Sequence, residues 1–177
     1  MSEVKNKNLL NLVLSAMFLA LGIVLPFLTG QIKEIGNMLL PMHIPVMLCG
    51  LICGPQYGLV VGVVAPLLRS ALFGMPAMYP HAINMVFELA TYGFMIGFLF
   101  SRAKWKCIKS LYRCLIMSML LGRAVWGIVM TVILGLGAEG FTLTAFLTSA
   151  FLNAIPGIIA QLILIPGIML ALNRTHL

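Results

Sequence analysis

Long apolar stretches alternate with short polar segments along almost the whole chain. A helix that spans a membrane needs about 20 mostly apolar residues, and six stretches of the sequence can meet this need. We therefore predict an all-α integral membrane protein that folds as a bundle of six transmembrane helices. The predicted helices cover residues of about 9–28, 36–53, 56–73, 81–100, 111–135 and 142–172.

The polar segments between these helices differ in charge. Basic residues precede the first helix, link the fourth to the fifth and follow the sixth, and an even number of crossings puts these three segments on one side. Because cytoplasmic loops are enriched in Lys and Arg, we expect both the N and the C terminus in the cytoplasm. The basic residues on that side are Lys5, Lys7, Arg102, Lys104, Lys106, Lys109, Arg113 and Arg174.

Composition supports a membrane protein. Of the 177 residues, 62% are hydrophobic and 8% are charged, whereas a soluble domain carries about 25% charged residues. The six predicted helices and the segments between them account for the whole sequence, so we expect a single membrane domain over residues 1–177. The net charge of +7 comes mostly from the cytoplasmic segments, so it indicates membrane orientation and not a nucleic-acid partner.

Proline and glycine interrupt several predicted helices near the loops of the outer side, which cover residues of about 29–35, 74–80 and 136–141. Such breaks are tolerated inside a membrane only where protein or a water-filled cavity satisfies the freed backbone groups. This pattern favours a pocket that opens to the outside.

Three ionisable residues lie inside the apolar stretches: Arg69, Glu88 and Arg123. A charge at the centre of a bilayer costs about 2.5–3.5 kcal/mol on the insertion scale. Such side chains usually face the interior of the bundle, where they mark a substrate site or an internal ion pair. If all three line one site, one positive charge is in excess and an acidic ligand would balance it.

The fourth predicted helix carries a row of polar groups. Its His81, Asn84 and Glu88 are spaced i, i+3 and i+7, and Tyr92 follows four residues later, so all four share one helix face. One interpretation is a wall of hydrogen-bonding groups for a polar ligand. The other is that Glu88 only neutralises Arg69 or Arg123.

Further candidates lie on the neighbouring helices. Arg123 and Trp126 are three residues apart on the fifth helix; arginine offers a planar fork suited to carboxylate or phosphate, and tryptophan offers a flat stacking surface. Asn153 on the sixth helix is a further candidate ligand contact. Arg69 could face the ligand or extend to the outer interface.

The sequence offers little for catalysis. It has no histidine cluster of metal-ligand spacing, no glycine-rich phosphate loop and no nucleophile with an evident base nearby. We expect neither an enzyme nor a metal or cofactor. The pattern predicts a binding subunit that needs a partner, since the chain has no ATP site of its own. The alternatives are a structural membrane subunit with internal ion pairs and a membrane enzyme that acts on a lipid.

Several motifs, taken in order, resemble one known family over nearly the whole chain: the substrate-binding S component of energy-coupling-factor (ECF) vitamin transporters. The resemblance rests on size, six predicted helices, a cytoplasmic N terminus and five short stretches. These are the Ala16-x-x-x-Ala20 pair, Leu-Pro-Met-His-Ile-Pro-Val at 40–46, Cys-Gly-Pro at 53–55, Pro-Leu-Leu-Arg at 66–69 and Phe-Glu-Leu-Ala-Thr-Tyr-Gly at 87–93.

The resemblance implies a multi-pass protein of the bacterial plasma membrane, surrounded by lipid, that captures a vitamin or related micronutrient from outside. It implies docking on a transmembrane scaffold subunit attached to two ATP-hydrolysing subunits, with Ala16 and Ala20 on the docking surface. The substrate stays open among pantothenate, pyridoxine-like, pyrimidine and riboflavin ligands. Buried arginine suits the carboxylate of pantothenate, which we favour among these.

Overall fold

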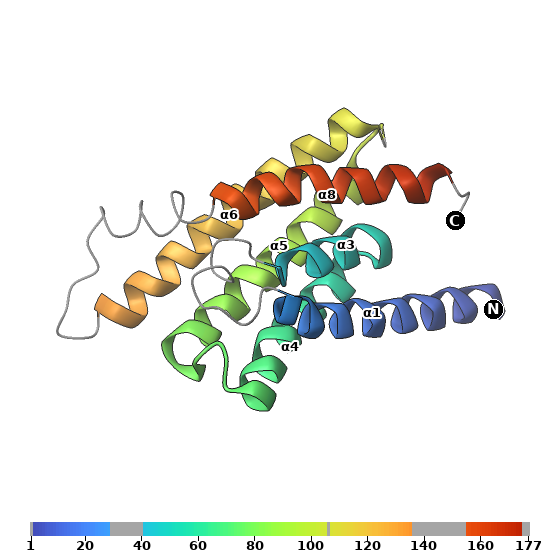
Figure 1. Cartoon of the computed structure of the whole chain (residues 1–177). Helices are drawn as coiled ribbons and strands as arrows, with labels where there is room; N and C mark the ends of the chain where they lie inside the picture. Colours follow the sequence, from blue (N-terminus) through green and yellow to red (C-terminus); the bar gives the residue numbers. More distant parts are fainter. Residues whose placement is uncertain (1, 29–40, 106, 136–154, 175–177) are drawn as a thin grey trace.

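The computed structural model describes residues 2–28, 41–105, 107–135 and 155–174, and within them it is helical with no strand (Figure 1). The elements are α1 (Ser2–Leu28), α3 (His43–Cys53), α4 (Pro55–Phe73), the π-helical turn η1 (Met78–Ala82), α5 (Ile83–Arg102), α6 (Ile108–Gly135) and α8 (Ile155–Arg174).

Five of these helices are long and apolar enough to cross a membrane. The candidate spans are Asn6–Phe27, Pro55–Phe73, Met78–Arg102, Ile108–Ile133 and Ile155–Leu172. The helix α3 is apolar but has only 11 residues, and part of the stretch predicted at 36–53 lies outside the described residues. The predicted count of six transmembrane helices and the single domain over 1–177 therefore stay predictions.

The observed helices extend further than the apolar stretches that predicted them. The helix α1 begins at Ser2 instead of residue 9, and α6 begins at Ile108 instead of residue 111. Hydropathy marks the part of a helix that can lie in lipid, whereas backbone hydrogen bonding continues into the flanking polar residues. The helix predicted at 81–100 begins later than expected. Residues 78–82 form η1, so α5 begins at Ile83 and not at residue 81.

The helix α5 lies at the centre of the described bundle. It packs against α3, α4 and α6, while α1 packs against α3 and α4, and α8 touches α3 and α6. Because three helices surround α5, the polar residues along it become buried.

Glycines set the close spacing of α3, α4 and α5, because small residues let helix backbones approach closely. A Cβ atom on Gly62 of α4 would lie 2.5 Å from the carbonyl oxygen of Leu89 on α5, and one on Gly97 of α5 would lie 2.5 Å from the carbonyl oxygen of Gly50 on α3. Gly93 of α5 likewise faces the backbone of Gly58 on α4. These helices touch backbone to backbone, which a larger residue would prevent.

The first turns of α1, the last turns of α8 and the link between α5 and α6 lie toward the same end of the bundle (Figure 1). This arrangement brings the predicted basic segments to one side, as an even number of crossings would. Which side of the membrane they face stays a prediction.

Candidate functional site

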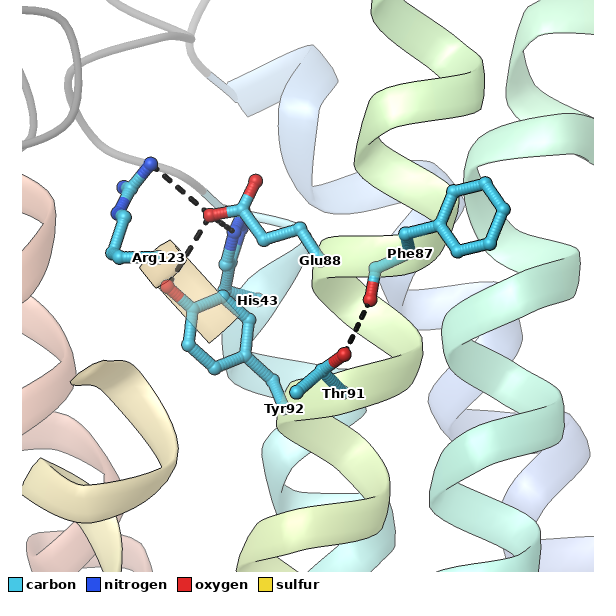
Figure 2. Close-up of polar contacts among 6 residues, drawn as sticks. All are labelled: His43, Phe87, Glu88, Thr91, Tyr92 and Arg123. Atoms are coloured by element: carbon cyan, nitrogen blue, oxygen red, sulfur yellow. Dashed lines mark hydrogen bonds and ion pairs between the residues drawn. The ribbon is translucent and has the colours of Figure 1, made fainter. Parts of the chain in front are cut away.

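A buried carboxylate forms the centre of a polar cluster between α3, α5 and α6. One oxygen of Glu88, Oε1, lies 3.0 Å from Nη1 of Arg123, accepts a 3.2 Å hydrogen bond from the hydroxyl of Tyr92 and lies 3.5 Å from Nε2 of His43. Figure 2 shows the three side chains converging on this oxygen. All four residues are almost completely buried. We call this set, His43, Glu88, Tyr92 and Arg123, the Glu88 cluster.

The cluster follows from helix geometry and packing. Glu88 and Tyr92 are one turn apart on α5, so they share a face, and that face meets His43 in the first turn of α3 and Arg123 in α6. Tyr92 also packs its ring edge-to-face on His43, with 5.2 Å between ring centroids. Gly122 makes room for this ring, because a Cβ atom there would lie 2.6 Å from Cε1 of Tyr92.

Asn84 and Trp126 form a second polar pair, one turn before Glu88 along α5. In the amide orientation that satisfies both groups, the oxygen of Asn84 accepts a 2.9 Å hydrogen bond from Nε1 of Trp126, and its nitrogen donates to the carbonyl of Trp126 over 3.2 Å. Asn84 is buried and Trp126 is half-buried. The pair therefore holds the indole ring in place next to the Glu88 cluster.

Several polar atoms of the Glu88 cluster have no hydrogen bond within the described part of the chain. These are Nε and Nη2 of Arg123 and Nδ1 of His43, and all three are shielded from solvent. A buried donor or acceptor left unpaired costs about 1–3 kcal/mol, and native proteins keep few such atoms. The cluster thus offers hydrogen-bonding capacity that its own residues do not use.

Arg69 lies in a different place from the Glu88 cluster. Its Nη1 donates a 2.8 Å hydrogen bond to the carbonyl of Ile23 on α1, and its guanidinium lies 5.3 Å from the ring centroid of Phe27 and 5.9 Å from that of Phe73. These contacts join the end of α1 to the end of α4. Glu88 is thus paired with Arg123, which decides between the two partners that the sequence left open. The role of Arg69 as a ligand contact stays a prediction.

The other predicted site residues are distributed as follows. His81 has an exposed side chain in η1, away from the buried row that continues through Asn84 and Glu88. Asn153 lies outside the described residues. Ala16 and Ala20 are exposed on α1, and their docking role stays a prediction.

Sequence reasoning missed His43 as a site residue. It was quoted only as part of the motif at 40–46, although it met the criterion that singled out Glu88, namely a polar side chain inside a predicted apolar helix. Gln161 of α8 is also buried, with its side-chain nitrogen unpaired. Among the described residues, no three His, Cys, Asp or Glu side chains come together as a metal site.

An apolar groove of about 250 Å³ lies between α5 and α6 and is lined by no residue of the Glu88 cluster. Phe87 borders this groove, and Figure 2 shows its side chain pointing away from Arg123 and Tyr92. The remaining lining residues are Ile83, Ile128, Val129, Val132 and Ile133.

Comparison with known families identifies the protein class. The family model of the substrate-specific component of ECF transporters matches residues 10–169. The chain belongs to this family. It is therefore a multi-pass protein of the cell membrane and a substrate-binding subunit of an ECF transporter, and the family is one of transporter components and not of enzymes. No curated protein and no solved structure matches the chain.

Substrate-specific components bind a small molecule and associate with an ECF module. The Glu88 cluster fits such a role, because it gathers charged and hydrogen-bonding groups in the interior of an otherwise apolar bundle. The same groups would be costly in the membrane interior if they served no purpose there.

Proposed function

We propose that this substrate-specific component binds its small molecule at the Glu88 cluster, in a pocket open to the outside. The observation that carries the proposal is the set of buried, unpaired polar atoms on Arg123 and His43. A substrate that supplies hydrogen-bonding partners for these atoms would gain affinity from them, since the described part of the chain supplies none.

Residues around the cluster complete the proposed site. Asn84 holds the indole of Trp126, which provides a stacking surface for a ring or an apolar chain of the substrate. Tyr92 keeps the carboxylate of Glu88 in position. We propose Arg69, His81 and Asn153 as further contacts of the substrate along its path from the outside.

The substrate we favour is pantothenate, whose carboxylate suits buried arginine. Pyridoxine-like, pyrimidine and riboflavin ligands also match a site that contains Glu, Asn, His and Trp.

For transport, we propose that α1 docks on a transmembrane scaffold subunit that is attached to two ATP-hydrolysing subunits. Within the chain, α1 uses its polar side: Asn11 donates to the carbonyl of Cys53 over 3.4 Å, and Ser15 accepts a 3.6 Å contact from the thiol of Cys49. Ala16 and Ala20 are exposed. Small residues on an exposed helix face allow another helix to approach closely. Both termini would lie in the cytoplasm, as the basic segments indicate.

The proposal is tested by native mass spectrometry of the detergent-purified chain, followed by denaturation and identification of any released molecule. We expect one vitamin per chain, either copurified or bound after incubation with a vitamin panel. A chain that stays empty and shows no thermal shift with any vitamin would favour the alternative of a structural subunit, in which Glu88 and Arg123 only form an ion pair. Conversion of an added lipid by the wild-type chain, lost in Glu88→Gln, would indicate a membrane enzyme.

A further inference from the structure

We infer that the substrate of this chain carries a carboxylate, and that Arg123 selects it through the edge formed by Nε and Nη2 while Nη1 stays paired with Glu88. This inference rests on the proposed function and adds which atoms of the site select the carboxylate of the substrate.

The guanidinium group of Arg123 has two distinct uses in this arrangement. Its Nη1 lies 3.0 Å from Oε1 of Glu88, and Figure 2 shows Glu88 on that side of the group. The hydrogens on Nε and Nη2 point in parallel from another edge of the same plane, which is the edge that binds carboxylates with two hydrogen bonds.

Both nitrogens of this edge are buried and unpaired in the described part of the chain. The side chain of Arg123 is 8% exposed, so this edge lies in the interior of the bundle. Two adjacent donors in one plane are best matched by two acceptor oxygens in one plane, and a carboxylate is the common group of a small metabolite that has them. An alcohol or a primary amide offers only one acceptor oxygen.

Glu88 fixes the orientation of this edge. It holds Nη1, and Glu88 is itself held by the hydroxyl of Tyr92 at 3.2 Å. A guanidinium group has five donors, so it can hold the carboxylate of Glu88 and a second carboxylate on separate edges. The unpaired Nδ1 of His43 is a further polar atom in the same cluster without a partner in the described part of the chain. Arg123 thereby acts as a specificity-determining residue and Glu88 as the residue that positions it.

The test uses isothermal titration of the purified full chain. It compares the affinity for vitamins that carry a carboxylate with the affinity for matched neutral compounds that lack it. The pairs are pantothenate and panthenol, nicotinate and nicotinamide, and biotin and biotinol. We expect one acid to bind at least about 100-fold more tightly than its neutral counterpart, the smallest difference expected when two hydrogen bonds to a charged group are lost.

The variant Arg123→Lys tests whether the planar pair of donors, and not the positive charge alone, selects the carboxylate. Lysine keeps a positive charge near Glu88 but has no planar pair of donors, so the preference for the acid over the neutral compound should fall at least about 10-fold. Arg113→Lys, an exposed position of α6, is the matched control and should keep the preference. If Arg123→Lys does not fold, the wild-type comparison of acids and neutral partners decides by itself.

Tight binding of a vitamin without a carboxylate, or of both members of a pair equally, would overturn the inference and leave the proposed function standing. An unchanged preference for the acid in a folded Arg123→Lys variant would overturn it as well. Binding of no vitamin of either kind would count against the proposed function and the inference together.

Discussion

Glu88 of α5 and Arg123 of α6 form a buried ion pair, with 3.0 Å between Oε1 and Nη1. The pair uses only one nitrogen of the Arg123 guanidinium group, because Nε and Nη2 have no partner in the described part of the chain. An ion pair that served only to neutralise two charges would be expected to satisfy these donors as well. We therefore propose that the two residues combine a structural contact with a site for a ligand.

Removing the charge of Glu88 is expected to destabilise the fold. Glu88→Gln leaves Arg123 as an unpaired buried charge, and breaking such a pair from one side costs about 3–5 kcal/mol. The measurement is the thermal denaturation midpoint in detergent, which should fall clearly in Glu88→Gln.

The double variant Glu88→Gln with Arg123→Gln is the control for this prediction, since it leaves no unpaired charge. It should be less destabilised than the sum of the two single variants, with a coupling of about 1–3 kcal/mol. Additive effects of the two substitutions would show that the residues do not interact in the folded protein.

The glycine contacts predict different outcomes for two glycine-to-alanine substitutions. In Gly93→Ala, the new Cβ atom would lie 2.5 Å from the carbonyl carbon of Gly58, so α4 and α5 must move apart at a cost of about 1–3 kcal/mol or more. In Gly167→Ala, no atom lies within 4 Å of the new Cβ. Thermal denaturation should show a loss of stability in the first variant alone, and equal midpoints would contradict the close approach of α4 and α5.

The docking role of α1 predicts a separation of binding from transport. Ala16→Trp places a bulky side chain on the exposed face of α1 without touching the Glu88 cluster, so vitamin binding should be unchanged while uptake by cells that contain the ECF module is lost. Ile163→Trp is the matched control, because Ile163 of α8 is 65% exposed; this variant should retain both activities. Normal uptake by Ala16→Trp would exclude this face as the docking surface.

Arg69→Met distinguishes a helix link from a ligand contact. The substitution removes the hydrogen bond to the carbonyl of Ile23 and the contacts with the rings of Phe27 and Phe73. A lost hydrogen bond from a charged group costs about 1.5–3 kcal/mol, so we expect a lower denaturation midpoint, and an unchanged affinity for the vitamin would remove Arg69 from the proposed substrate contacts. A large loss of affinity at an unchanged midpoint would place Arg69 at the substrate instead.

Much of the candidate site could be predicted from single positions along the chain. Polar residues in apolar stretches are conspicuous because the membrane interior penalises them, and this criterion found Asn84, Glu88, Tyr92 and Arg123, which are all buried. It also selected His81, whose side chain is exposed, because helical periodicity was extended across residues 78–82, where the chain forms η1. His43 met the criterion and was still not proposed.

The sequence by itself determined the class of this protein. Hydropathy, charge distribution and short motifs are properties of each segment, so they can be recognised without any contact between segments, and they sufficed for a helical membrane protein of the ECF substrate-binding family.

Only the tertiary structure decided which polar residues meet. That Glu88 pairs with Arg123, that His43 and Tyr92 converge on the same oxygen, and that Arg69 turns to α1 depend on how closely α3, α4, α5 and α6 pack. This spacing is set by contacts such as Gly62 on the backbone of Leu89. Such contacts join residues far apart in the chain, and periodicity along one helix carries no information about the face that its neighbour presents.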